Sequence, residues 1–310
     1  MFTLLKMNTV NKQNKTMKKY KYSLDTSSKK FICPMCKMKT LVKFIDTETK
    51  SYLSDDLGRC DRESSCGYFN VPSNGIIIKK ERIIDYVETS FHSLQLVESG
   101  FLSKKRNNFI QFLMNNFPEK AVNEVVSKYL ISTSNRWDCS TVFWQIDNYE
   151  CAHAGKILAY NKETGKRIKN NDGKALIDWV HSVLKRKGII HDFNLRQCLF
   201  GLHLINGVNA KVIGLVESEK TAVLMSLFKP EYIWMATGSK GGLKYELLLP
   251  IKQYRIIAFP DKSEYNDWLI KAKQLNGFNF DIVVNDWLEN TNYEDGIDLA
   301  DVLLLENKNV

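Results

Sequence analysis

The sequence has 310 residues, of which 44% are hydrophobic and 25% are charged, and its formal net charge is +9. This composition is ordinary for a globular protein and excludes a chain that is disordered throughout. No apolar stretch approaches the roughly 18–20 residues that a transmembrane helix needs, which excludes a membrane span. The length allows about two or three compact units with their own cores.

The positive charge is unevenly distributed along the chain. Residues 1–30 hold eight Lys and one acidic residue, whereas residues 31–75 are neutral. Residues 76–205 carry +6 and residues 206–310 carry −4. We therefore expect a basic, disordered tail over residues 1–24, followed by a neutral piece, a basic middle and an acidic end.

The tail carries no recognisable targeting signal. Its apolar stretch, residues 2–5, is too short for the core of a signal peptide. The expected location is therefore the cytoplasm, where free or metal-bound thiols are more common than disulfides. Translation from either Met1 or Met17 gives a sensible N-terminus, and the sequence leaves this choice open.

Cysteines predict a zinc ribbon over residues 25–75. Two have the C-x-x-C spacing that places both thiolates on one side of a tight turn, and a hairpin built from residues 41–46 and 52–53 returns the other two. Four free thiols are the alternative, but the segment has too few large apolar residues to fold without a metal. Four thiolates leave no open coordination position, so we expect a structural Zn²⁺. The expected ligands are Cys33, Cys36, Cys60 and Cys66.

The middle of the chain has two parts. Residues 76–135 form a helical segment in which the spacing of apolar residues predicts helices over 83–96, 107–115 and 119–129. Residues 136–205 are basic and β-rich, and strands are expected over 141–147 and 156–160, with a turn at 161–165. The aromatic residues of the helices fit a core better than a base-stacking surface.

Basic side chains gather near the second of these strands. Lys156, Lys166, Arg167 and Lys169 lie on or beside the expected hairpin. Such a run is most often a solvated face. The alternative is a groove for a nucleic-acid backbone or for nucleotide phosphates.

Residues 206–310 alternate between buried-strand and helix patterns, which predicts a parallel sheet flanked by helices. The expected strands are 211–217, 233–237, 255–259 and 280–284, and the expected helices are 218–228 and 267–275. The fold class is therefore α/β with an α+β portion upstream.

Two carboxylates follow strands of this sheet. Glu217 ends the first strand and Asp261 follows the third. Ligands of parallel sheets bind at the carboxyl ends of strands, and Mg²⁺ is typically held there by one or two carboxylates together with substrate phosphates. A helix N-cap or a solvated loop is the alternative for each acid.

These residues resemble a Toprim domain, the metal-binding fold of bacterial DNA primases and topoisomerases. The strand ending in Glu stands here as Val216-Glu217-Ser218, the strand followed by Asp-x-Asp as Phe259-Pro260-Asp261-Lys262-Ser263, and the later acidic segment as Gly296–Asp301. The order of the upstream parts is also similar to that of primases, so the resemblance covers about residues 30–305. The size resembles that of small zinc-ribbon/Toprim proteins of phages and mobile elements.

The resemblance implies a Rossmann-like C-terminal domain and a primase that makes short RNA or mixed primers on single-stranded DNA from nucleoside triphosphates. It implies Mg²⁺ or Mn²⁺ at Glu217 and Asp261, no membrane, and a replicative helicase as a partner. Further roles are implied as follows: Glu264 and Asp298 as helpers of the metal site, Lys156, Arg167 and Lys169 as contacts to nucleotide or DNA phosphates, and Arg59, Arg62 and Tyr68 as ribbon contacts to the template.

The sequence departs from the family pattern at one important position. Ser263 stands where the second carboxylate of Asp-x-Asp belongs, and Glu264 follows it. This motivates one alternative to a primase, a non-catalytic adaptor that binds single-stranded DNA through a degenerate Toprim domain. A Toprim nuclease is a third hypothesis. A topoisomerase is not expected, because no module with a nucleophilic Tyr is evident.

Overall fold

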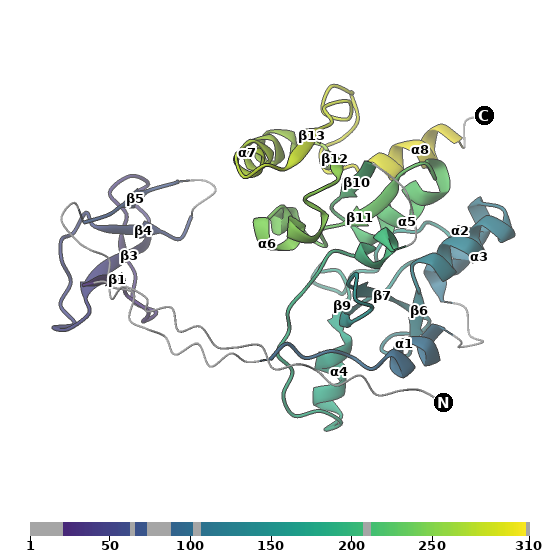
Figure 1. The fold of residues 1–310 in the computed structure, drawn as a ribbon, viewed down its shortest axis with the longest axis horizontal. Coiled ribbons are helices and arrows are strands. Elements are labelled where there is room, and N and C mark those ends of the chain that lie inside the picture. The colour runs from purple at the N-terminus through teal and green to yellow at the C-terminus, as the bar shows by residue number, and fades with distance from the viewer. Residues whose placement is uncertain (1–20, 63–65, 73–87, 102–106, 207–211, 308–310) are drawn as a thin grey trace. The chain divides into compact units, whose positions relative to one another are not determined.

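The computed structural model describes residues 21–62, 66–72, 88–101, 107–206 and 212–307. The chain divides into two compact units, Met1–Val87 and Glu88–Val310 (Figure 1). No helix in the described ranges is both long and apolar enough to cross a membrane.

The first unit contains one antiparallel sheet. Its strand order is β1-β3-β4-β5, and β2 pairs with β3 beside β1. Most of the predicted basic tail, residues 1–20, lies outside the described residues. Residues 22–24, which we assigned to that tail, instead pair with β3, because the Tyr-Ser-Leu triplet can add a strand to its edge. The strands are β1 (Tyr22–Leu24), β2 (Phe31–Ile32), β3 (Lys39–Asp46), β4 (Gly58–Cys60) and β5 (Phe69–Asn70).

Alternation along β3 gives this small sheet two different faces. Leu41 packs with cysteines and aromatic residues on one face. Phe44, on the other face, stacks on Phe69 with ring centroids 6.3 Å apart. Gly58 allows β4 to approach β3, because a Cβ there would lie 2.4 Å from the carbonyl oxygen of Val42.

The second unit begins with helices and an antiparallel sheet of order β6-β7-β8-β9. The helices predicted over 107–115 and 119–129 are confirmed as α2 and α3. The helix predicted over 83–96 is wrong in its described part: residues 88–93 are not helical, and α1 begins only at Leu94. The elements are α1 (Leu94–Phe101), α2 (Asn108–Asn116), α3 (Glu119–Lys128), β6 (Ser132–Ser134), β7 (Ser140–Ile146), β8 (Ala152–Leu158), β9 (Ile177–Trp179) and α4 (Val180–Arg186).

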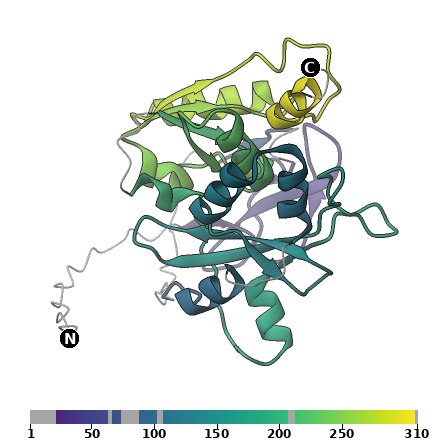
Figure 2. The ribbon, with the colours of Figure 1, turned by 90° about the vertical axis from the view of Figure 1, so that its right-hand side faces the viewer.

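The antiparallel sheet is covered on both faces, which explains why all of β7 and β8 is buried. Val142 and Trp144 of β7 pack toward α1 and α4, and these helices lie together on one side of the sheet (Figure 2). Phe143 points to the opposite face and joins the main core. Lys156 lies directly across from Phe143 in the β7–β8 register, so it also points toward the parallel half of the unit.

The chain then forms a four-stranded parallel sheet of order β11-β10-β12-β13, which confirms the predicted α/β fold. In Figure 1, α5 and α8 lie on one side of this sheet and α6 and α7 on the other. The elements are η1 (Leu202–Ile205), β10 (Val212–Val216), α5 (Glu219–Phe228), β11 (Ile233–Ala236), η2 (Lys240–Gly242), α6 (Tyr245–Leu248), η3 (Leu249–Ile251), β12 (Arg255–Ala258), α7 (Tyr265–Asn276), β13 (Asp281–Val284) and α8 (Leu299–Asn307).

One hydrophobic core joins the two sheets of the second unit. It runs from α2 and α3 through Phe143 to the strands and helices of the parallel half. The buried Tyr129 hydroxyl lies 2.7 Å from both Ser226 Oγ and the carbonyl oxygen of Trp234. Phe200 pairs with Ala236 through two backbone hydrogen bonds of 3.0 and 3.1 Å, so the segment before β10 lies along the edge of β11. The predicted boundary near residue 135 therefore divides β6 from β7 within one sheet, and the boundary near residue 205 separates two sheets that share a core.

Candidate functional site

The four predicted zinc ligands come together in the first unit. Their Sγ atoms all lie within 4.8 Å of one another. The Cys33–Cys66 and Cys36–Cys60 sulfur distances are 3.7 and 3.9 Å. Four sulfurs about 2.3 Å from one tetrahedral ion lie about 3.8 Å apart, so the spacing fits Zn²⁺.

Neighbouring polar groups favour the charged form of Cys36, whereas burial raises the pKa of Cys66 to about 11. The backbone N–H of Met38 lowers the pKa of Cys36 to about 6, despite partial desolvation. The Thr40 hydroxyl lies 3.2 Å from Cys60 Sγ and 3.8 Å from Cys36 Sγ, where it can donate to either thiolate. Such contacts outside the ligands orient them and support metal binding. The site is closed by four sulfurs, so the zinc it holds is structural.

The predicted template contacts of the ribbon differ in their surroundings. Arg59 and Arg62 are both exposed. Tyr68 is half-buried beside the cysteines, and its hydroxyl donates to the carbonyl oxygen of Asp56 at 2.7 Å. The sequence missed Phe69, which lies opposite Arg59 in the β4–β5 register and is 58% exposed. Successive side chains of a strand point to opposite faces, so an expected strand after Cys66 would have placed Tyr68 and Phe69 on different faces.

In the second unit, Glu217 and Asp261 lie beyond the carboxyl ends of adjacent parallel strands. Glu217 directly follows β10, and Asp261 comes three residues after the end of β12. From β10 the chain crosses through α5 to β11 on one side, whereas β12 pairs with β10 on the other. The strand order therefore reverses between β10 and β12, and parallel sheets bind ligands in the crevice at such a point.

Burial and repulsion from nearby acids raise the pKa values of these two carboxyls. For Asp261, burial is the main cause, the charges of Asp298 and Glu217 add to it, and the pKa rises to about 8. For Glu217, burial again comes first and the charge of Glu264 adds to it. Arg167 opposes both increases. These neighbouring acids thus gather negative charge that a cation would stabilise.

Asp298 lies beside this pair, at the start of α8. It is 9% exposed, and burial raises its pKa, whereas Lys220 acts to lower it. One carboxylate oxygen accepts from the Asp301 backbone N–H at 2.9 Å and the other from the Thr221 hydroxyl at 2.8 Å. Asp298 therefore both caps α8 and adds charge to the site. Thr221 and Asp301 were not predicted as participants, although Asp301 ends the quoted acidic segment and Thr221 lies three residues after the first motif.

Glu264 and Ser263 occupy the loop after Asp261. Glu264 forms an ion pair with Lys240 through one carboxylate oxygen. Its Oε2 is buried and has no hydrogen-bond partner among the described residues. Ser263 has a left-handed backbone (φ 72°), and its hydroxyl donates to the Lys262 carbonyl oxygen at 2.5 Å. Ser263 is exposed and has no charge, whereas the charge of Glu264 acts on Glu217.

Lys156 acts electrostatically on Glu217, and Arg167 acts on both Glu217 and Asp261. Arg167 pairs with Tyr160 at the base of the turn over 161–165. Desolvation acts to lower the pKa of Arg167, but Tyr160 and then Glu219 outweigh it and the pKa is raised. Gly165 holds this turn against α2, because its φ is 64° and a Cβ would lie 2.6 Å from the Phe112 ring. Lys169 is exposed and lies farther along the same hairpin.

Lys156 has a buried acidic partner that the sequence did not reveal. Its ammonium donates to both carboxylate oxygens of Glu219 at 3.0 and 3.1 Å, and to the carbonyl oxygen of Gly238 at 2.9 Å. Lys156 is 7% exposed and Glu219 is 1% exposed. The pair joins β8 to the first turn of α5, two residues after Glu217. The positive charge of Lys156 is therefore neutralised by Glu219 within the protein.

The oxygen donors around Glu217 and Asp261, which we call the carboxylate site, fit a divalent cation that also binds water and substrate. Glu217 and Asp261 supply half-buried oxygen donors, and the unpartnered Oε2 of Glu264 supplies another. Within the described ranges, only the cysteines form a group of three or more ligands within 4.8 Å of one another. Mg²⁺ is typically held by one or two carboxylates and keeps several waters and substrate phosphates, so two carboxylates are enough for such a site.

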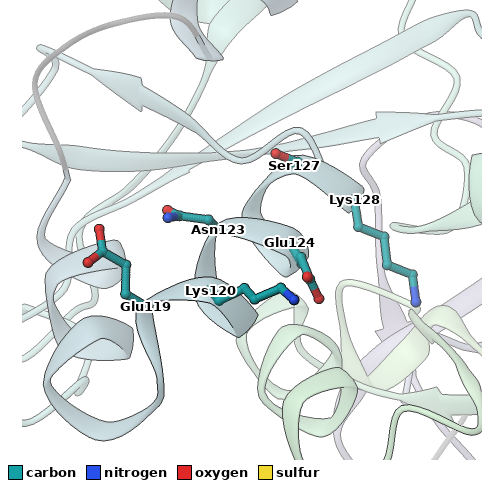
Figure 3. Close-up of a pocket in the computed structure, with 6 residues that line it drawn as sticks. All are labelled: Glu119, Lys120, Asn123, Glu124, Ser127 and Lys128. Carbon is teal, nitrogen blue, oxygen red and sulfur yellow. The ribbon is translucent and has the colours of Figure 1, made fainter.

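A hollow along α3 is unrelated to either site. All the side chains that line it project from this one helix (Figure 3). One exposed helix face supplies no converging walls, so we assign it no ligand. The lining residues are Glu119, Lys120, Asn123, Glu124, Ser127 and Lys128.

One protein-family model matches most of the second unit. A family described as a domain of unknown function, DUF6371, matches residues 107–262, slightly more than half of the chain. The chain belongs to this family. The DUF6371 match includes Glu217 and Asp261 and ends before Asp298. A zinc β-ribbon finger model matches residues 20–83 and, together with the cysteine cluster, identifies a zinc-ribbon protein. No curated protein matches the chain.

Solved structures similar to this DUF6371 protein include DNA primases. The Escherichia coli primase catalytic core is 12% identical, with a TM-score of 0.43, over 68% of this chain and 74% of that one. The RNA polymerase domain of Mycobacterium tuberculosis primase DnaG is 12% identical, with a TM-score of 0.41, over 69% and 80%. The primase fragment of the bacteriophage T7 primase-helicase protein is 13% identical, with a TM-score of 0.40, over 90% and 96%.

Proposed function

We propose that this protein is a DNA primase-like nucleotidyltransferase that makes short primers on single-stranded DNA during replication of a phage or mobile element. The observation that carries the proposal is that Glu217 and Asp261 follow two adjacent strands at the point where the strand order of the parallel sheet reverses. The motifs in which these acids stand resemble those of Toprim primases. A replicative helicase is the expected partner.

The residues around Glu217 and Asp261 fit the chemical requirements of nucleotidyl transfer. Glu217 and Asp261 would hold Mg²⁺ or Mn²⁺, with Glu264 and Asp298 adding negative charge. When bound, the metal would stabilise charge on the transferring phosphoryl group and orient the attacking 3′-hydroxyl. Arg167 acts electrostatically on the same carboxyls, and we propose that it binds the phosphates of a nucleoside triphosphate.

The remaining basic residues would serve the template. Lys169 is exposed on the hairpin that carries Arg167. Arg59 and Arg62 are exposed on the zinc ribbon. Contacts from such side chains to phosphates position a strand without reading its sequence. Tyr68 would support this surface, and the more exposed ring of Phe69 is better placed to stack on a base.

Incorporation of labelled nucleotides on a single-stranded template tests the proposal. We expect a product that depends on added Mg²⁺ or Mn²⁺. Glu217→Gln and Asp261→Asn keep the shape of each side chain but remove its charge, so each should reduce the rate about a hundredfold, equivalent to about 3 kcal/mol. Asp286→Asn changes an exposed carboxylate of the same unit and serves as the control. Equal product from wild type and from the double variant would contradict the metal assignment.

A non-catalytic adaptor for single-stranded DNA is the second candidate. Ser263 favours it, because its exposed hydroxyl is bonded to the adjacent carbonyl oxygen and supplies no carboxylate. An adaptor would bind single-stranded DNA with an affinity that falls with salt, as phosphate contacts require, and would give no metal-dependent product. Cleavage of the labelled strand in place of extension would instead indicate a nuclease.

A further inference from the structure

A cavity of about 300 Å³ lies on the α5 and α8 side of the parallel sheet, apart from the carboxylates that face the β10–β12 switch point. Its apolar wall is largely aromatic. Leu299 and Leu303 of α8 close one side. The aromatic residues are Tyr232, Trp234, Phe259 and Trp287.

A glycine in β10 makes room for this aromatic wall. Gly214 lies between Trp234 and Ile257 in the strand register, and a Cβ there would approach the Trp234 ring to 2.5 Å. The indole therefore lies over β10 and meets Phe259 with ring centroids 5.2 Å apart. Tyr232 packs on Trp234 at the same distance. These contacts fix three of the four rings.

The fourth ring is available to a ligand. Trp287 is 44% exposed, and within the described part of the chain it contacts no other aromatic ring. Its position is held by the hydrogen bond from its backbone N–H to Asn285 Oδ1 at 3.0 Å. An exposed indole at the mouth of an aromatic cavity offers one flat face for stacking.

Polar groups of both charges line the same cavity. Lys229 and Glu231 come from the loop between α5 and β11, and neither has an ion-pair partner among the described residues. Asn285 uses its Oδ1 to accept the Trp287 N–H, while its amide nitrogen donates to no described residue. The cavity thus presents a cation, a carboxylate and an amide donor around aromatic rings. Ligand sites commonly combine apolar walls with a few such groups.

We propose that this cavity binds the nucleoside 5′-monophosphate moiety of a nucleotide. The base would stack on Trp287, the phosphate would pair with Lys229, Glu231 would accept from the sugar hydroxyls, and the Asn285 amide would donate to the base. A purely apolar ligand would leave both charges unused. The volume lies at the lower end of the range for ligand sites, which fits one nucleotide unit better than two. The proposal does not depend on the proposed polymerising activity.

Calorimetric titration of the zinc-loaded full chain without added Mg²⁺ or Mn²⁺ tests this site. The probes are AMP and GMP, compared with adenosine, which lacks the phosphate, and ribose 5-phosphate, which lacks the base. We expect saturable binding of at least one monophosphate. Trp287→Ala removes an exposed side chain and should weaken binding about tenfold, the effect typical of one base stack. Lys229→Gln should weaken AMP or GMP by a similar factor and leave adenosine unchanged.

Two further variants separate this cavity from other surfaces. Ile270→Ala removes an exposed apolar side chain of α7 and should leave binding unchanged. The double variant Glu217→Gln, Asp261→Asn should also bind the monophosphate normally, even if it has lost all nucleotide incorporation. Loss of binding in that double variant would show that the nucleotide binds at Glu217 and Asp261 and would overturn the inference. No saturable binding of AMP or GMP, or binding unaffected by both Trp287→Ala and Lys229→Gln, would also overturn it.

Discussion

Asp261→Asn should stabilise the second unit when no divalent cation is added, and the gain should grow with pH. Burial and the charges of Asp298 and Glu217 raise the pKa of Asp261 from 3.8 to about 8. The folded protein therefore holds a proton that the unfolded chain has lost. The stability contributed by this protonated carboxyl is complete below pH 3.8 and is lost as pH rises through about 8. Asparagine does not titrate, so the variant avoids the loss.

The size of the effect follows from the same pKa values. At about 1.4 kcal/mol for each tenfold change in proton affinity, the full difference corresponds to about 6 kcal/mol. Asp261 keeps partial contact with solvent, and its surroundings can relax, so we expect about a third of that, about 2 kcal/mol at pH 9. For a unit of this length, Glu88–Val310, such a difference raises Tm by roughly 4–8 °C.

Thermal unfolding between pH 5 and pH 9, without added Mg²⁺ or Mn²⁺, measures this difference. The Tm advantage of Asp261→Asn should be small at pH 5 and largest at pH 9. Saturating Mn²⁺ should reduce the Tm advantage of the variant, because the cation compensates the negative charge of the wild-type carboxylate. Asp286→Asn should show neither trend. The reasoning is refuted if wild type and Asp261→Asn lose stability in parallel as pH rises.

Three other outcomes follow from particular contacts. Lys156→Met should destabilise the second unit by about 3–5 kcal/mol in denaturant unfolding, because it leaves Glu219 buried without its partner, and adding Glu219→Gln should recover part of the loss. Cys36→Ser should lower the zinc content below one ion per chain and remove the β-sheet signal of the first unit, and retention of both would contradict a structural zinc site. Gly165→Ala should cost about 1–3 kcal/mol in thermal unfolding, because it strains a left-handed residue and presses a methyl group against Phe112, and an unchanged Tm would show that this turn can move away.

The sequence predicted the parallel sheet well because its strands are buried and its caps are local. The stretch before Glu217 is apolar throughout, and Ser218 then accepts from the Thr221 N–H at 3.1 Å to cap α5. Both signals lie within a few residues and need no tertiary information. The same holds for the four cysteines, whose spacing is matched to one tetrahedral ion.

The partner of Lys156 could not be predicted in this way. Its neighbour Glu219 lies 63 positions away, and pairing requires two sheets to pack against each other. A lysine in a basic stretch suggests a contact to an anionic ligand, whereas here the anion is a buried carboxylate of the same chain. The helix predicted over 83–96 failed for a related reason: the backbone of His92 donates to the Ala152 carbonyl oxygen at 2.8 Å, an edge contact that overrides local helical periodicity.

The pairing of Phe200 with Ala236 has a consequence for how this protein can be divided. An outer strand without this cover would expose a row of backbone donors and acceptors, which is a template for pairing with other chains. A fragment that starts at residue 206 would lose both backbone hydrogen bonds and part of its core. We therefore expect such a fragment to aggregate, whereas one that starts at Glu88 keeps its sheet edge protected. The predicted boundary at residue 206, which rests on charge and motifs, is thus not a position at which a stable fragment can begin.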